Sequence, residues 1–208
     1  PGAVMEAAML LYEEIGDLAV LDIGGATTDV HSVTAGSEEI AALLTAPEPF
    51  SKRTVEGDLG LFVNARRLIE LVGEDKLNRE LEMDVPAVMR TYEPIPHTPE
   101  QLRLTERLCL EAGVIAIDRH AGRLRHYYTP QGRATAAEGK DLTKVKTVIG
   151  TGGALTRLPG RERILRRLAD CNAGNTMLYP KPGAAKIAFD EKYVMASLGV
   201  LSKTRPQA

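Results

Sequence analysis

The sequence predicts an α/β fold, in which helices flank a mixed sheet that begins with an antiparallel meander. Short apolar runs typical of buried strands stand at residues 18–23, 30–33 and 145–149. Segments with the periodicity of helices lie before, between and after these runs. With 208 residues, of which 44% are hydrophobic, the chain has enough apolar material for one large core or two small ones.

The predicted meander occupies the start of the chain. A helix over residues 1–14 leads to the strand at 18–23, which is apolar apart from one aspartate near its end. Two glycines at 24–25 favour a tight turn into the second strand at 30–33, where β-branched residues alternate with polar ones. A third strand is expected at 39–45, and the three strands together form an antiparallel meander.

The rest of the chain is mostly helical in its pattern. Thr98, Pro99 and Gln101 have the spacing of a helix start, because threonine can cap the first turn and proline fits its first position. The remaining elements are expected to be helices at 61–72, from Pro99 to Gly122, at 161–169 and at 191–201, and strands at 124–128, 145–149 and 177–179.

A charged, proline-bearing stretch at 73–99 marks a boundary or an inserted small helical subdomain. We therefore predict a main subdomain made of residues 1–60 and 140–208, into which a smaller α/β subdomain, residues 61–139, is inserted. Pro1 opens the chain in place of a methionine, and the first helix starts without a leading linker. We interpret the chain as a fragment of a longer protein, from which some functional groups are absent.

Composition and charge argue against several classes of protein. Lys and Arg total 26 against 28 for Asp and Glu, so the net charge of -2 gives no global attraction to nucleic acid or anionic lipid. Cys109 and Cys171 have no metal-ligand spacing, which argues against structural zinc and against a disulfide-stapled secreted module. No apolar run approaches the length of a membrane span. We expect a cytoplasmic protein without a nucleic-acid or membrane partner.

The segment from Asp22 to Asp29 is the first candidate site. Glycines at a hairpin turn let backbone N–H groups approach an anion closely, and Thr27 and Thr28 add hydroxyl donors. The two flanking aspartates would repel a polyphosphate unless Mg²⁺ stood between them, directly or through water. Carboxylate, cradle and carboxylate together therefore indicate a metal nucleotide. The alternative is a tight structural hairpin that Asp29 caps.

A second glycine-rich segment, residues 150–155, follows a strand and precedes a helix. It is not a dinucleotide fingerprint, because Leu155 stands where that motif needs its last glycine. The sequence contains no P-loop motif either. What remains is a flat patch against which a nucleoside or phosphate could lie, or an ordinary strand-to-helix turn.

Taken together, these segments resemble the motifs of a known superfamily. Residues 21–30 (LDIGGATTDV) resemble the second phosphate motif of actin, Hsp70 chaperones and sugar kinases, and residues 148–156 (VIGTGGALT) resemble their adenosine motif. Residues 55–60 (VEGDLG) are similar to the element that follows the meander in the chaperone branch. More narrowly, the motifs are similar to those of the MutL/GlmL family, accessory proteins of cobalamin-dependent glutamate mutase and D-ornithine aminomutase.

The resemblance implies the ribonuclease-H-like second lobe of a two-lobed, actin-type ATPase that takes ATP or ADP with Mg²⁺. It implies that Asp22 is catalytic and that Asp22 and Asp29 hold Mg²⁺ through water. The other implied contacts are, for the phosphates, Gly24, Gly25, Ala26, Thr27 and Thr28 and, for the adenosine, Gly150, Gly152, Gly153 and Ala154. The superfamily's first phosphate motif is absent from this sequence, which implies a missing N-terminal lobe. We expect weak nucleotide binding and no efficient hydrolysis by this fragment.

For the intact protein, the resemblance implies an ATP-dependent reactivating chaperone of an adenosylcobalamin-dependent mutase, which drives exchange of damaged cobalamin. Two alternatives stay open, a small-molecule kinase of the same superfamily and an actin-like scaffold that does not hydrolyse nucleotide. Glu56 and Asp58 either orient water or cap the next helix. His31 is expected to be a hydrogen-bonded strand histidine rather than a phosphate contact.

Overall fold

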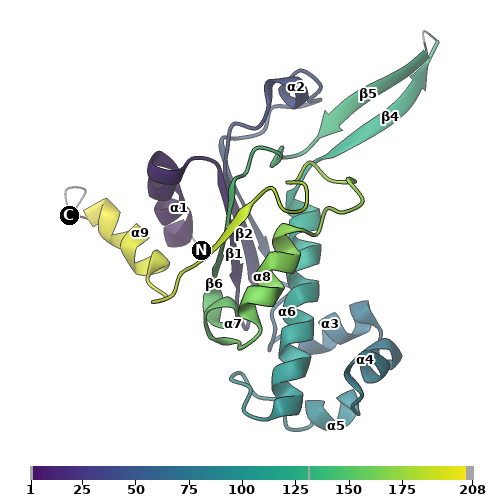
Figure 1. The fold of residues 1–208 in the computed structure, drawn as a ribbon, viewed down its shortest axis with the longest axis vertical. Helices are drawn as coiled ribbons and strands as arrows, with labels where there is room; N and C mark the ends of the chain where they lie inside the picture. Colours follow the sequence, from purple (N-terminus) through teal and green to yellow (C-terminus); the bar gives the residue numbers. More distant parts are fainter. Residues whose placement is uncertain (1, 131, 205–208) are drawn as a thin grey trace.

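A computed structural model describes residues 2–130 and 132–204, so Pro1, the predicted start of the first helix, lies outside the described residues. The centre of the molecule is a five-stranded sheet with helices on both faces (Figure 1). The order across the sheet is β3-β2-β1-β6-β7. These strands are β1 Leu18–Ile23, β2 Thr28–Val33, β3 Ser51–Glu56, β6 Thr147–Thr151 and β7 Lys186–Phe189.

The sheet is mixed, as predicted. β1, β2 and β3 form an antiparallel meander, and β6 and β7 continue the sheet parallel to β1. In this register, Asp22 near the end of β1 pairs with Asp29 of β2 on one side and with Thr151 of β6 on the other. A three-stranded meander followed by two parallel strands is the ribonuclease-H-like arrangement. The predicted fold class is therefore confirmed.

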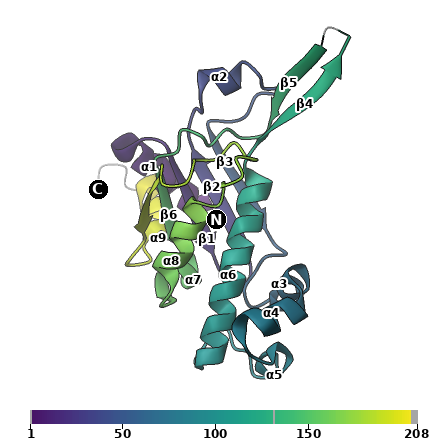
Figure 2. The same cartoon turned by 45° about the vertical axis from the view of Figure 1, so that its right-hand side comes forward.

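The helices surround this sheet in three groups (Figures 1 and 2). Their bounds are α1 Gly2–Ile15, α2 Glu38–Ala41, α3 Ala65–Val72, α4 Glu74–Leu81, α5 Val85–Met89, α6 Pro99–His120, α7 Gly152–Arg157, α8 Arg161–Ala169 and α9 Met195–Thr204. α1 and α9 pack against each other on one face of the sheet, and α6, α7 and α8 cover the other. α3, α4 and α5 cluster around the N-terminal end of α6.

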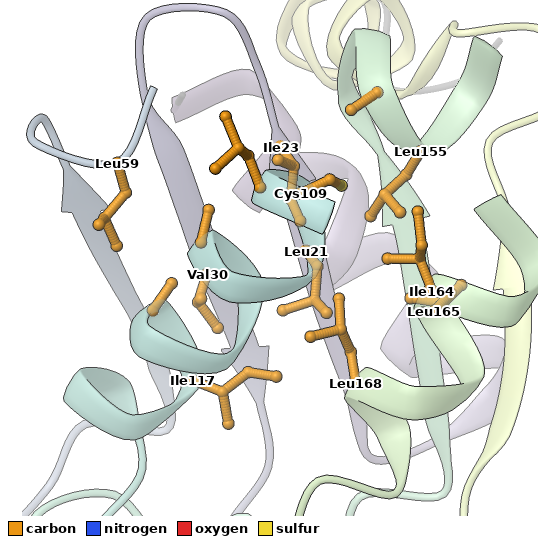
Figure 3. Close-up of a cluster of buried hydrophobic side chains, with 14 of the residues drawn as sticks. Leu21, Ile23, Val30, Leu59, Cys109, Ile117, Leu155, Ile164, Leu165 and Leu168 are labelled. Atoms are coloured by element: carbon orange, nitrogen blue, oxygen red, sulfur yellow. The ribbon is translucent and has the colours of Figure 1, made fainter. Parts of the chain in front are cut away.

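Side-chain alternation along β1 decides which helices cover each face. Ala19, Leu21 and Ile23 enter the larger core, which they share with apolar residues of α6 and α8 (Figure 3). Leu18 and Val20 face the other way, into a smaller core with α1. The sheet is therefore the middle of three layers, and its alternate residues belong to two different cores.

The segment between α6 and the sheet forms a separate ribbon, in which β4 (Arg123–Thr129) and β5 (Gly132–Glu138) pair antiparallel and project from the body (Figure 1). The division of the chain into residues 1–60 with 140–208 and an inserted 61–139 stays a prediction. Within the inserted range, α6 packs on the main sheet against β1, β2 and β3.

Several predicted elements are confirmed, with ends that shift by a few residues. They are the helix at the start of the chain, the first two strands, the strands at 124–128 and 145–149 and the helix at 161–169. The long helix also begins as predicted. Thr98 Oγ1 accepts a hydrogen bond from the N–H of Gln101, and Pro99 is its first residue.

Two predicted strands are wrong. Residues 39–45 contain the short helix α2, because Ser37 Oγ accepts a hydrogen bond from the N–H of Ile40 and caps its first turn. The third strand of the meander is β3, an edge strand whose charged, partly exposed residues hide it from an apolar pattern. Residues 177–179 form no strand, and the side-chain amide of Asn172 bonds to their backbone instead. The strand at that edge of the sheet, beyond β6, is β7.

Candidate functional site

The turn between β1 and β2 presents backbone donors beyond the end of the sheet. The N–H of Gly24 donates to the carbonyl of Thr27 (3.0 Å), and the carbonyl of Gly24 accepts a bond from the N–H of Leu61 (3.1 Å). Residues 61–64 form a turn, and the helix predicted at 61–72 begins only at Ala65 as α3. The exposed N–H groups of Gly25 and Ala26 have no acceptor among the described residues. Such free amides at a turn can bind an anion.

The glycine-rich segment after β6 packs against the end of β1. Gly152 has a φ of +81°, and a Cβ there would stand 2.6 Å from Asp22 Oδ1 and 2.5 Å from the carbonyl oxygen of Ile23. The fold itself therefore requires glycine at this position. A Cβ on Gly153, in contrast, would meet no atom within 4 Å. The open space beside Gly153 is available to a ligand.

One cavity of about 440 Å³ connects the two glycine segments. The glycine-segment residues that line it are Gly24, Gly25, Gly153 and Ala154. Side chains from residues 61–62, residues 92–96, α6 and the end of α7 complete the walls. Arg157 is the one charged residue in the described lining. An apolar cavity of this size with a few polar groups is typical of a small-molecule site.

Phe62 and Tyr92 stack along this cavity, with ring centroids 6.3 Å apart and an interplanar angle of 27°. The Tyr92 hydroxyl donates to the Leu61 carbonyl (3.3 Å) and shares a 2.7 Å hydrogen bond with the Thr105 hydroxyl. Burial raises the pKa of Tyr92, so the hydroxyl stays protonated at neutral pH. This aromatic wall was not predicted, and its only signal in the sequence is a tyrosine before the proline-rich residues 94–96.

Asp22, Asp29 and His31 gather on the face of β1 and β2 that α1 covers. One oxygen from each carboxylate and one ring nitrogen lie within 4.8 Å of one another. Burial raises the pKa of Asp22, and the neighbouring Asp29 carboxylate raises it further. Burial also raises the pKa of Asp29, which a hydrogen bond from Thr27 partly offsets. A divalent cation would stabilise both carboxylates in the ionised form.

His31 is fully buried, and neither of its ring nitrogens has a hydrogen-bond partner among the described residues. The expectation of a hydrogen-bonded strand histidine is therefore wrong. Burial, helped by the charge of Arg53, lowers the pKa of His31 to about 4, so the ring is neutral at pH 7. The other buried histidine, His120, is the opposite case. Its Nε2 lies 2.8 Å from Ser32 Oγ and its Nδ1 lies 3.0 Å from Thr54 Oγ1.

Some residues assigned to phosphate or adenosine lie away from the cavity. The Thr28 hydroxyl donates to the carbonyl of Leu59 (2.8 Å) in the core. Gly150 faces α8, where an added Cβ would stand 3.1 Å from a leucine methyl group. Ala26 and Thr27 stay at the turn, beside the cavity rather than in its lining. Thr28 and Gly150 therefore contribute to the packing of the fold rather than to the cavity.

Glu56 and Asp58 form ion pairs with Arg119 in the last turn of α6. Arg119 Nη1 lies 2.5 Å from Glu56 Oε2 and 2.7 Å from Asp58 Oδ1. The hydrogen bond from Arg119 lowers the pKa of Asp58. Neither carboxylate caps α3, whose first turn has no side-chain cap. The pair instead joins the end of β3 to α6.

Asp190 is a neighbour of the site that was not predicted. Its carboxylate accepts hydrogen bonds from the N–H groups of Val194 (2.9 Å) and Met195 (3.0 Å) and from the Thr151 hydroxyl (3.0 Å). It therefore fixes the start of α9, which begins later than predicted. Its charge contributes to the raised pKa of Asp22. The signal in the sequence is an aspartate between a short apolar run and a helix.

A family model described as MutL protein matches residues 1–208. This chain belongs to the MutL protein family. The predicted family is thereby confirmed. Protein MutL of Clostridium tetanomorphum is 39% identical over 221 residues, which cover 99% of this chain and 47% of that protein. The chain spans about half the length of this MutL relative.

A solved structure, that of ethanolamine utilization protein EutJ from Carboxydothermus hydrogenoformans, aligns with this MutL chain at 17% sequence identity and a TM-score of 0.38. The alignment covers 96% of this chain and 53% of the EutJ chain.

Within residues 2–130 and 132–204, no helix has the length and apolar character that a bilayer span requires.

Proposed function

We propose that this chain is the nucleotide-binding lobe of an actin- and Hsp70-type ATPase, with ATP or ADP and Mg²⁺ as ligands. The observation that carries the proposal is the cavity of about 440 Å³ shared by the β1–β2 turn and the start of α7. A turn with free N–H groups suits phosphate, and an apolar cavity suits a nucleoside. A nucleotide combines both chemistries in one molecule.

In this proposal the phosphates lie at the turn, where the N–H groups of Gly25 and Ala26 are free to donate. The nucleoside lies in the open space beside Gly153, which no packing contact fills. The stacked rings of Phe62 and Tyr92 give this space a planar apolar wall.

Asp22 and Asp29 would hold Mg²⁺ through water beside the turn. The fit of this pair rests on Asp29 Oδ1, which is buried without a described partner, and on the raised pKa of both carboxyl groups. When bound, Mg²⁺ neutralises phosphate charge that the carboxylates would otherwise repel. We assign the catalytic role to Asp22, because it is the less buried of the two and stands at the end of β1.

For the intact protein, we propose reactivation of a cytoplasmic adenosylcobalamin-dependent mutase of the glutamate mutase or D-ornithine aminomutase type. Support comes from the motif segments, which resemble the MutL/GlmL family, and from membership of the MutL family. A second lobe would supply the first phosphate motif. Closure of two lobes around the nucleotide would change their angle, and this motion would open the mutase and release damaged cobalamin.

Titration calorimetry with Mg-ADP and Mg-ATP tests the nucleotide site. We expect saturable binding by the wild type and its loss in Gly153→Val, a cavity-lining position where an added Cβ would meet no protein atom within 4 Å. Gly57→Val is the matched control, because an added Cβ there also meets nothing within 4 Å and lies outside the cavity lining. Equal binding by wild type and Gly153→Val would contradict the assignment.

The role in reactivation needs a separate assay with the intact protein. A cobalamin-dependent mutase is inactivated with a damaged cofactor and then incubated with the intact protein, ATP and fresh adenosylcobalamin. We expect mutase activity to return only when ATP is present, and not with an Asp29→Asn variant. Recovery without ATP, or no recovery in any combination, would contradict this part of the proposal.

A further inference from the structure

The cluster of Asp22, Asp29 and His31 lies on the sheet face against which α1 packs, and none of the three residues lines the apolar cavity. By strand alternation, Asp22 lies on the same face of β1 as Val20. Asp29 and His31 lie on the same face of β2 as Val33, and pairing of the strands makes this one face of the sheet. Val20 and Val33 pack with α1 in the smaller core. The acidic end of the β1–β2 hairpin therefore shares its face with the apolar residues of the smaller core.

Among the described residues, this cluster also holds most of the buried side-chain polar atoms that lack a hydrogen-bond partner. Asp29 Oδ1 and both ring nitrogens of His31 are buried without a hydrogen bond to any described residue. Outside the cluster, the described part of the chain has one more such atom, the Tyr179 hydroxyl oxygen. A buried polar group without a partner destabilises the fold, and native proteins contain few of them. Their concentration at one place points to a group outside the chain that completes them.

The spacing of the donor atoms suits a single metal ion. The three ligand atoms lie within 4.8 Å of one another. An ion with bonds of about 2.0–2.2 Å holds its ligand atoms about 3–4 Å apart, so a small inward movement of the carboxylates closes the set. Both ring nitrogens of His31 are buried without a described partner, so one of them is free to face the metal.

The nitrogen donor decides which metal fits best. Mg²⁺ prefers oxygen ligands and water in octahedral geometry, and it gains little from an imidazole. Mn²⁺, Co²⁺ and Zn²⁺ accept one nitrogen beside two carboxylate oxygens. We propose that Asp22, Asp29 and His31 bind a divalent transition-metal ion through two carboxylate oxygens and one imidazole nitrogen. Because it shares both carboxylates with the nucleotide site, this inference rests in part on the proposed function.

The first test is a titration of the protein with Co²⁺ in the absence of nucleotide, followed by visible absorption. We expect saturation at one ion for each chain, and a Mg²⁺ excess of about tenfold that fails to displace it. His31→Gln should weaken Co²⁺ binding by about tenfold or more, because it removes the nitrogen ligand. His126→Gln is the matched control, since this histidine is exposed on the β4–β5 ribbon. No saturable binding, or equal loss in both variants, would overturn the proposal.

A second measurement does not depend on the variant. Nitrogen-15 spectra of the wild-type histidines, recorded with and without Zn²⁺, report which ring nitrogen gains a metal. We expect one nitrogen of His31 to shift while His120, which is fully hydrogen bonded, does not. Unchanged His31 signals would overturn the proposal whatever the variant does.

The outcomes separate this inference from the nucleotide site. His31 does not line the cavity, so His31→Gln should still bind Mg-ADP in calorimetry. Nucleotide binding without Co²⁺ binding would refute the transition-metal site and leave the nucleotide site standing. Co²⁺ binding without nucleotide binding would refute the proposed function and leave the metal site standing.

Discussion

The two faces of the β1–β2 hairpin use alternate residues of the same strands, yet they treat buried polar groups in opposite ways. On the α6 face, Ser32 bonds to His120 and Thr28 bonds to the Leu59 carbonyl. On the α1 face, Asp29 and His31 carry buried atoms without a described partner. The polar groups of the α6 face therefore find partners within the chain, whereas these atoms of the α1 face have none among the described residues.

The largest loss of stability is expected from a substitution that removes packing on the α6 face. Leu21→Ala removes a fully buried side chain from the larger core, and it should lower the free energy of unfolding by about 2–5 kcal/mol in urea titrations. Ile15→Ala, at an exposed apolar position of α1, should change it by less than about 0.5 kcal/mol. Equal losses in both variants would contradict the assignment of the core.

The two buried histidines give a direct comparison of the faces. Without metal at pH 7, His120→Leu should lower the free energy of unfolding by about 1–3 kcal/mol, because the buried Ser32 hydroxyl loses its partner. His31→Leu removes nitrogens that have no partner, so it should leave the stability unchanged or raise it slightly. Chemical denaturation with a chelator present measures both. A loss in His31→Leu as large as that in His120→Leu would contradict the comparison.

Lowering the pH should widen the difference in free energy of unfolding between the wild type and His31→Leu. Burial lowers its folded-state pKa from 6.5 to about 4, so the unfolded chain binds more protons between these values. The stability from the neutral ring is present above pH 6.5 and is lost as the pH falls toward 4. Between pH 7 and 5.5, the wild type should lose about 1 kcal/mol more than His31→Leu. Parallel pH profiles of the two proteins would show that His31 titrates normally.

The smallest expected effect concerns the glycine segment at the start of α7. Gly153→Ala should change the free energy of unfolding by less than about 0.5 kcal/mol, because an added Cβ meets no atom within 4 Å. Gly152→Ala should be clearly destabilising, since its Cβ would approach the Ile23 carbonyl to 2.5 Å at a positive φ. Thermal unfolding of the two variants compares neighbouring glycines, of which only one serves the fold. Similar losses in both would show that Gly153 is also a packing position.

Sequence patterns identified the parts of this fold that local rules determine. β1 is an uninterrupted apolar run with one aspartate, and α6 has a threonine cap and a proline in its first turn. The two edge strands were not predicted, because β3 buries little on either face and β7 has only four residues. Within the main sheet, the apolar pattern thus found the buried strand β1 and missed the edge strands.

The candidate site was predictable only in part, for a similar reason. The two glycine segments are local motifs, and the parallel pairing of β1 with β6 brings them together. The Phe62 and Tyr92 wall and the bond from Thr151 to Asp190 depend on contacts between distant segments. The unpaired state of His31 is also invisible in the sequence, because it depends on which side chains fail to reach the ring.

The most direct test of the nucleotide site is an NMR titration of the nitrogen-15-labelled protein with Mg-ADP up to about 10 mM, which detects a Kd near 1 mM. We predict progressive shifts at Gly24, Gly25, Gly153 and Ala154, the two segments that line one cavity. Gly57, outside the cavity lining, should not move. The account would be contradicted by the absence of shifts over this range, or by shifts in only one of the two segments.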